Sequence, residues 1–196
     1  MKMGSSFHGD RSRTLVSCPQ PRGLRGFTLI ELMVTIAILA VLLGIAVPSF
    51  QEMSLSSRLR SSANSLAASV QLARSEAIKR NAVVQLCASS NGTSCGGSWQ
   101  QGWIVLASDN TVLHAQAALA SGYVVSALKE GTSTAVAALK FQPSGVGLQL
   151  DAEATIATAE FRICRASPSA GSQERKVRVS STGRTLVTTT TEGSCS

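Results

Sequence analysis

The sequence predicts an α+β fold in which one long N-terminal helix packs on an antiparallel, sandwich-like β domain of about eight strands. Three observations lead to this prediction. Residues 27–47 form an apolar run of helical length, interrupted only by two threonines and one glutamate. Apolar residues then recur at helical spacing through residues 55–77. Beyond Asn81 the apolar period changes to two, and turn residues interrupt the pattern at short intervals.

The apolar run at residues 27–47 is long enough to cross a membrane. Its 21 residues would make a helix of about 31 Å, and the hydrocarbon core of a bilayer is about 30 Å thick. A secretory signal would have a shorter apolar region followed by a small-x-small cleavage site, and neither occurs here. Arg22 and Arg25 precede the run with no acid near them, so the positive-inside rule places the N-terminal side in the cytoplasm. We expect the rest of the chain to lie outside the cytoplasm.

Residues 48–80 continue the helix as an amphipathic segment. Apolar side chains spaced by three, four or seven residues form one face that packs under a sheet. Pro48, with Gly44 just before it, predicts a kink near this position. Glu76 and Arg80 are spaced for an i,i+4 ion pair. The apolar stripe consists of Leu55, Leu59, Leu66, Val70, Ala73 and Ala77.

Residues 81–196 form the predicted β domain. Short runs rich in β-branched and aromatic residues alternate with turn signals, which indicates antiparallel strands joined by short connections. Turns are expected at residues 109–110, at residues 143–145 and at a hairpin loop of residues 181–183. The strand runs are residues 82–88, 102–108, 111–115, 123–127, 135–142, 157–164, 175–180 and 184–189.

The cysteines indicate an oxidising compartment. Of the five cysteines, Cys18 precedes the apolar run, and the remaining four are an even number in loop-rich sequence. We expect Cys87 to pair with Cys95, which closes the loop between them. We expect Cys164 to pair with Cys195, which attaches the C-terminal tail to a strand. The other possible pairings are less local.

The sequence carries no signature of catalysis or of a bound cofactor. It contains no HExxH, P-loop or GxSxG motif, and no nucleophile has a base at recognisable spacing. The cysteines lack the CxxC spacing of zinc sites. His114 is the only histidine after the apolar run begins, and its strand pattern favours a surface position. We therefore predict a non-catalytic protein with no metal and no cofactor.

Glu31 is an ionisable residue inside the apolar run, and such residues are functional candidates that need a cation as partner. The segment RGLRGFTLIE, which contains it, resembles the prepilin-peptidase site of type IV pilins and type II secretion pseudopilins. The resemblance implies that the peptidase cuts between Gly26 and Phe27 and that the new amino group of Phe27 is methylated. It also implies that Glu31 pairs with the N-terminal amine of a neighbouring subunit during assembly. Pro48 falls where pilins often carry a helix-kinking proline.

Later segments of the chain resemble, in order, the pattern of the GspH/FimT family of minor pilins and pseudopilins. The matching segments begin at LARSEAIKRNAVVQLC and continue through FQPSGVG, FRIC and VRVSSTGR. The family fold is a pilin helix followed by a β-sandwich-like domain, in agreement with the periodicity above. The resulting domain assignment is a cleaved leader at 1–26, a transmembrane and assembly helix at 27–47, its amphipathic continuation at 48–80 and a β domain at 81–196.

The hairpin near the C-terminus is the most basic part of the β domain. Residues 161–185 contain six cations and one acid, so this hairpin could present a cationic face to DNA phosphates, or simply a solvated strand face. In DNA-uptake members of the family a G-R-x-R motif in this hairpin marks DNA binding. Here the motif reads GRTL, so only its first arginine, Arg184, is present. The cationic face would comprise Arg175, Lys176, Arg178 and Arg184.

The resemblance implies a structural minor pilin of a type IV pilus. Such a protein is inserted in the inner membrane with a periplasmic domain, processed by prepilin peptidase, and incorporated with other major and minor pilins near the filament tip to prime assembly. The alternatives are the equivalent pseudopilin of type II secretion, a DNA-binding minor pilin for natural transformation, and an unprocessed single-pass membrane protein. DNA is the less favoured partner, because the second arginine of the motif is absent.

Overall fold

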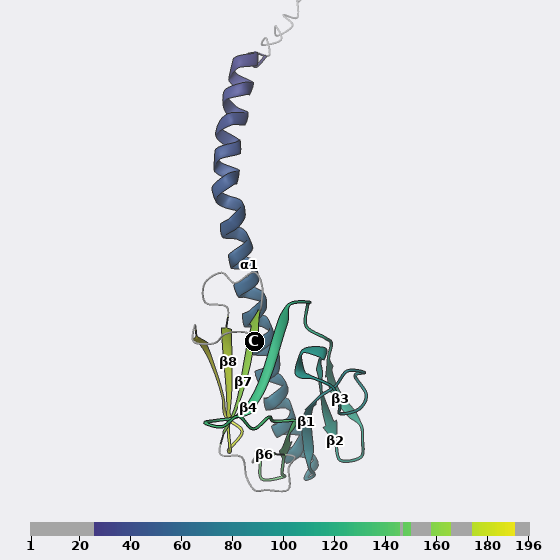
Figure 1. The fold of residues 1–196 in the computed structure, drawn as a ribbon. Helices are drawn as coiled ribbons and strands as arrows, with labels where there is room; N and C mark the ends of the chain where they lie inside the picture. Colours follow the sequence, from purple (N-terminus) through teal and green to yellow (C-terminus); the bar gives the residue numbers. More distant parts are fainter. Residues whose placement is uncertain (1–25, 146, 150–157, 166–173, 191–196) are drawn as a thin grey trace, which may run out of the picture. The chain divides into compact units, whose positions relative to one another are not determined.

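The structure is a computed structural model that describes residues 26–145, 147–149, 158–165 and 174–190. Helix α1, Leu29–Arg80, contains 52 residues and continues on both sides of Pro48 (Figure 1). The internal contacts of the chain group into two compact units, and the boundary between them lies within this helix. The first unit ends at Leu43 and the second begins at Gly44.

The N-terminal unit is the first part of α1, and its side chains are exposed. Thr28 caps the helix, because its carbonyl accepts a hydrogen bond from the Leu32 amide at 3.1 Å and its hydroxyl accepts one from the Glu31 amide at 3.3 Å. Every large apolar residue from Phe27 to Val47 is at least half exposed. By length and composition, α1 contains a segment suited to crossing a membrane.

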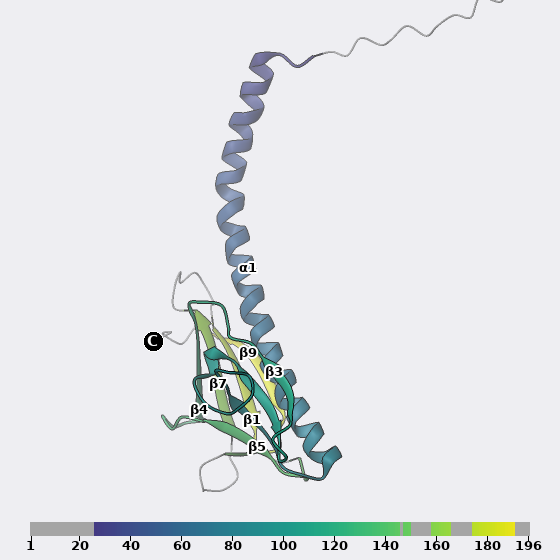
Figure 2. The same cartoon turned by 90° about the vertical axis from the view of Figure 1, so that its right-hand side faces the viewer.

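The C-terminal half of α1 buries one apolar face. The predicted stripe is buried from Leu59 to Ala77, with Leu55 only partly buried. Figures 1 and 2 show this half lying along strands of the β domain. Its buried residues share one core with both sheets, which confirms the predicted packing of helix on sheet. They are Leu59, Ala63, Leu66, Ser69, Val70, Ala73 and Ala77.

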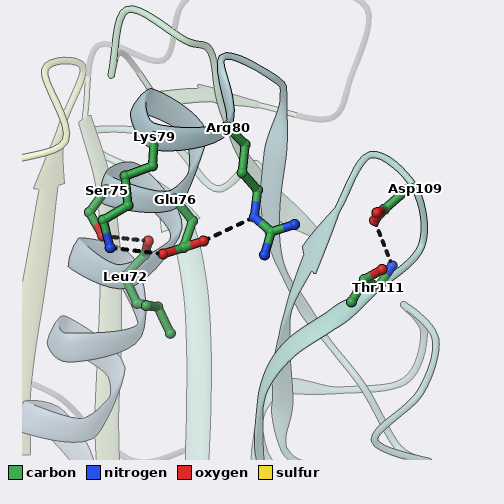
Figure 3. Close-up of polar contacts among 7 residues, drawn as sticks. All are labelled: Leu72, Ser75, Glu76, Lys79, Arg80, Asp109 and Thr111. Atoms are coloured by element: carbon green, nitrogen blue, oxygen red, sulfur yellow. Dashed lines mark hydrogen bonds and ion pairs between the residues drawn. The ribbon is translucent and has the colours of Figure 1, made fainter.

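Helix α1 ends in a Schellman-type cap. Asn81 adopts the left-handed conformation with φ of 49°, and the Ala82 amide donates to the Ala77 carbonyl at 3.2 Å. Glu76 accepts a hydrogen bond from Arg80 at 2.9 Å, as the i,i+4 spacing predicted, and another from Lys79 at 3.1 Å (Figure 3). These bonds hold the pKa of Glu76 below its ordinary value, and the bond from Arg80 has the larger effect.

The first sheet has five antiparallel strands in the order β3-β2-β1-β5-β6. The β2–β3 hairpin turns at Asp109 and Asn110, as predicted, and Asn110 has a φ of 63°. The Asp109 carboxylate accepts a hydrogen bond from the Thr111 amide at 3.0 Å (Figure 3), and this bond is the main reason why the pKa of Asp109 is lowered. The strands are β1 Val84–Ala88, β2 Trp103–Ala107, β3 Val112–Gln116, β5 Ala138–Phe141 and β6 Gly147–Gln149.

The second sheet has four antiparallel strands in the order β4-β7-β8-β9. The predicted loop at residues 181–183 joins β8 to β9, and the Gly183 amide donates to the Ser180 carbonyl at 2.8 Å. The strands are β4 Tyr123–Lys129, β7 Thr158–Arg165, β8 Glu174–Ser180 and β9 Thr185–Thr190.

Each of the eight predicted strand runs overlaps one strand, and β6 is an additional strand that the sequence did not reveal. Its three residues, Gly147–Gln149, begin with glycine and include no β-branched or aromatic side chain, so no period-two pattern exists to detect. The predicted turn at residues 143–145 precedes it, with Gly145 at a φ of 78° and its amide bonded to the Gln142 carbonyl at 2.7 Å.

Two tryptophans connect parts of the core. The Trp103 indole donates to Ser69 Oγ of α1 at 3.0 Å, which joins the helix to the first sheet. The Trp99 indole donates to the Val136 carbonyl at 2.9 Å, and its ring meets Phe161 of the second sheet edge-on, with centroids 4.9 Å apart. Both act as packing residues, because Trp103 is fully buried and Trp99 nearly so.

Candidate functional site

The expected processing site lies where the chain enters α1. Gly26, Phe27 and Thr28 precede the helix in non-helical conformation, and the Phe27 side chain is 83 % exposed. A side-chain carbon added at Gly26 would meet no atom within 4 Å. The peptide bond between Gly26 and Phe27 therefore lies outside the helix, between two exposed residues.

Glu31 lies in the first turn of α1, four residues after Phe27. Its carboxylate is exposed, and no cation pairs with it within the part of the chain that the structure describes. A negative charge in the first helical turn is favourable because the free amide groups of the helix carry partial positive charge. In an apolar environment this carboxylate would still need a full cation as its partner.

Cys87 and Cys95 form a disulfide in the structure, with Cα atoms 5.6 Å apart. The bridge joins β1 to the loop that follows it, and Gln85 Nε2 contacts Cys95 Sγ at 3.1 Å. Within this loop Asn91 Oδ1 accepts hydrogen bonds from the amides of Thr93 and Ser94, both at 2.9 Å. The loop between the two cysteines is therefore ordered by polar contacts as well as by the disulfide.

The second expected disulfide cannot be placed in the same way. Cys164 lies on β7, but Cys195 lies outside the described residues. The Cys164–Cys195 pair therefore stays a prediction.

The prediction that Arg175 belongs to an exposed cationic face of the C-terminal hairpin was wrong. Side chains alternate along β8, and Arg175 lies on the same face as Val177 and Val179, which are buried in the core. Arg175 is only 7 % exposed, and its guanidinium donates to Ser56 Oγ of α1 at 2.8 Å. Arg175 therefore cannot share a surface with Lys176 and Arg178, which lie on the opposite face.

On that opposite face, acids from other strands pair with the cations. Arg178 pairs with Glu130, which follows β4, and Lys176 lies 3.7 Å from Glu160 of β7. Arg162 lies 2.6 Å from Glu160 and 3.7 Å from Glu174. Three cations and three acids thus give a neutral cluster, and the expected face of Arg175, Lys176, Arg178 and Arg184 does not form.

Arg184 is the fully exposed member of that group, whereas Lys176 and Arg178 are partly buried. It is exposed at the β8–β9 turn, and its side chain makes no ion pair among the described residues. A small pocket of about 360 Å³ beside it is lined by Arg178, Ser180 and Leu186, among others. One exposed arginine beside a neutral cluster should bind phosphates much more weakly than the four cations that the sequence indicated.

No catalytic or metal-binding arrangement emerges from the described part of the chain. Within it, no group of three or more His, Cys, Asp or Glu side chains could hold a metal. An apolar groove of about 690 Å³ lies beside the Cys87–Cys95 disulfide and Trp99, and Lys140 is the single ionisable side chain in its lining. His114 lies on edge strand β3, partly exposed.

Both the N-terminal segment and the β domain of the chain match known protein families. Residues 22–47 match the prokaryotic N-terminal methylation motif, and residues 62–183 match the family described as type II transport protein GspH. The pilin-like protein PilA1 of Thermus thermophilus is 50 % identical over 62 residues, which are 32 % of this chain and 38 % of that protein. The chain therefore matches well under half the length of this relative.

The fold is similar to that of the type IV minor pilin FimU of Pseudomonas aeruginosa. The superposition has a TM-score of 0.50 at 23 % identity, and it covers 68 % of this chain and 90 % of FimU. The GspH match spans more than half of the chain and includes the end of α1 and most of the β domain. The chain therefore belongs to the GspH family of pilin-like proteins, and it carries the family's N-terminal methylation motif at the start of a membrane-length helix.

Proposed function

We propose that this protein is a minor pilin that is processed by prepilin peptidase and then built into a type IV pilus at or near its tip. The observation that carries this proposal is the junction at the start of α1. There the exposed residues Gly26 and Phe27 are followed by Glu31, which pairs with no cation among the described residues and lies on an exposed apolar helix. The β domain that follows this helix matches the family described as type II transport protein GspH, and its fold is similar to that of the minor pilin FimU.

The proposed sequence of events begins in the inner membrane. Residues 27–47 span the bilayer with the leader in the cytoplasm and the β domain in the periplasm, where the Cys87–Cys95 disulfide is stable. Cleavage after Gly26 releases the leader and creates the amino group of Phe27. That cation, or the same group on a neighbouring subunit, then becomes the partner of Glu31.

Processing gives the first prediction. Coexpression with an active prepilin peptidase should yield a chain that begins at N-methyl-Phe27, whereas Gly26→Val should prevent cleavage, because the bulkier side chain blocks the scissile position. Intact-mass measurement of the purified protein distinguishes the two products. Gly23→Val in the same leader is the control and should be cleaved normally. A wild-type chain that keeps its leader beside active peptidase contradicts the proposal.

Assembly gives the second prediction. Glu31→Val should be cleaved and methylated normally but should be lost from sheared filaments, because the amine of Phe27 then has no counter-charge in an apolar environment. The amount of the protein in sheared filaments, measured by immunoblot against its amount in the membrane, gives the readout. Glu52→Val removes an exposed carboxylate farther along α1 and serves as the matched control. Equal incorporation of both variants would refute the role of Glu31.

The equivalent role in type II secretion is the second candidate, because the matched family is described as a type II transport protein. The same cleavage and the same use of Glu31 apply there. Deletion of the gene separates the two roles, since it should abolish surface pili in one case and protein secretion in the other.

A further inference from the structure

The outer edge of strand β4 is only partly paired. β4 is the last strand of the second sheet, and its strand neighbour in that sheet is β7 (Figure 1). In an antiparallel pair, the backbone groups of successive residues point alternately toward the partner strand and away from it. The Glu130 amide donates to the Thr158 carbonyl of β7 at 2.9 Å, so even-numbered residues of β4 bond β7 and odd-numbered residues point outward. The outward groups therefore belong to Tyr123, Val125, Ala127 and Lys129.

The chain itself covers the C-terminal end of this edge. The Lys129 amide donates to the Thr134 carbonyl at 2.9 Å, and the Val136 amide donates to the Ala127 carbonyl at 2.8 Å. The pairing stops there, because the Val136 carbonyl accepts the Trp99 indole N–H at 2.9 Å and not the Ala127 amide. One end of the edge therefore already holds an added segment of chain.

The rest of the edge has backbone groups without partners. Among the described residues, no hydrogen bond reaches the Val125 amide or carbonyl, the Ala127 amide or the Tyr123 carbonyl. Two donors and two acceptors thus lie within five residues, which span about 17 Å of extended chain. Proteins usually protect such an edge with a charged side chain, a proline or a bulge. Residues 123–127 read YVVSA and contain none of these, so the edge is open to a further strand.

The apolar groove of about 690 Å³ borders this edge. Its lining includes Val125 and Ala127 of β4, together with Trp99 and Val136. The volume lies within the range of about 300–1,000 Å³ that is usual for ligand pockets. Lys140 is the one charged side chain in the lining, and it forms no ion pair among the described residues. The groove therefore offers apolar contacts, backbone hydrogen bonds along one wall and a single positive charge.

We propose that this groove binds an extended segment of a partner protein, which adds to the open edge of β4 as a further strand. An extended backbone is the occupant that matches two donors and two acceptors on alternate residues. Side chains on one face of the added strand enter the apolar groove, and a carboxylate among them pairs with Lys140. The partner segment therefore has apolar residues at alternate positions and one acid. The inference depends neither on processing at Gly26 nor on entry into a filament.

Synthetic hexapeptides test this on the full-length chain in detergent. The three probes alternate valine with threonine, and in each a different valine is replaced by aspartate. Hydrogen exchange resolved by nuclear magnetic resonance reports on single backbone amides. We expect at least one probe to bind and to slow exchange of the Val125 and Ala127 amides. The slowing should be about tenfold when about nine-tenths of the chain is bound, because only the free fraction then exchanges.

Backbone-methylated peptides distinguish strand addition from apolar contact alone. In an added strand, alternate amides of the peptide face β4 and the others face away. Methylation of one alternate set of nitrogens should therefore abolish binding, whereas methylation of the other set should leave it. Equal effects of the two sets would contradict strand addition.

Charge reversal locates the peptide in the groove. Lys140→Glu should weaken binding of the aspartate peptide by about threefold to tenfold, because repulsion replaces attraction in a partly exposed pair. A peptide with lysine in place of the aspartate should regain this loss. Arg184→Glu makes the same charge change outside the groove and should leave binding unchanged. Three outcomes would each overturn the proposal and leave the pilin assignment untouched. They are no binding of any probe at about 1 mM, binding without protection of Val125 and Ala127, and an equal loss in both charge variants.

Discussion

Trp103→Ala should lower the free energy of unfolding of the β domain by about 3–5 kcal/mol, which is the usual cost of replacing a buried tryptophan with alanine. The Trp103 side chain is fully buried between the first sheet and α1, and its indole N–H is bonded to Ser69. The substitution therefore opens a cavity and removes a polar link between helix and sheet. Urea titration of the full-length chain in detergent, followed by near-ultraviolet circular dichroism, measures the change.

Two milder variants separate packing from hydrogen bonding at this site. Trp103→Phe keeps most of the apolar volume, and Ser69→Ala leaves the indole N–H without its acceptor, which costs about 1–3 kcal/mol. A double-mutant cycle between the two positions isolates the coupling. A Trp103→Ala variant as stable as the wild type would show that α1 does not depend on this contact.

Gly102→Ala should lower the free energy of unfolding by about 3 kcal/mol or more, which combines backbone strain with a steric clash. Gly102 has a φ of 121°, a conformation that other residues rarely adopt. A methyl group there would lie 2.4 Å from the backbone oxygen of Gln116 and 3.3 Å from that of Ser89. Because both are backbone atoms, the clash cannot be relieved by a rotamer change.

Gly92→Ala is the control for Gly102→Ala. Gly92 also has a positive φ, 72°, but a methyl group there would meet no atom within 4 Å. Its substitution should therefore cost only the strain of a left-handed alanine, about 1–2 kcal/mol. Thermal unfolding of the two variants side by side gives the comparison. If the two substitutions lower the free energy of unfolding by the same amount, the close backbone contact at Gly102 does not add to the cost of Gly102→Ala.

Sequence alone predicted most of the fold because each element has a local signal. The buried stripe on α1 has helical spacing, and eight strands have a period-two pattern between turn residues. The short strand β6 has no such signal, since it is held by pairing with β5 and not by its own composition. The local pattern thus finds elements that carry their own periodicity and misses those that depend on a neighbour.

The surface chemistry of the hairpin was harder to predict, for a similar reason. Strict alternation along β8 already places Arg175 with Val177, and this part could have been predicted from the sequence. The acids that pair with Lys176 and Arg178 are Glu160 and Glu130. The pairing of β7 with β8 brings Glu160 to the hairpin, and the loop after β4 brings Glu130 there. Counting charges within one stretch of sequence cannot include them. The methylation motif at residues 22–47 could be recognised from the sequence because it lies in one short stretch, and the roles of Gly26, Phe27 and Glu31 within it stay predictions.

The exposed apolar surface of α1 also restricts how the protein can move between environments. Sixteen large apolar side chains from Phe27 to Met53 are at least half exposed, and burying each stabilises by roughly 1.5–3 kcal/mol. Transfer of this segment from lipid into water would therefore cost on the order of tens of kcal/mol, which makes a free aqueous intermediate negligible. Entry into a filament would then transfer this segment directly from lipid to a protein environment. The equilibrium would depend on the difference between the free energies of the helix in lipid and in contact with protein.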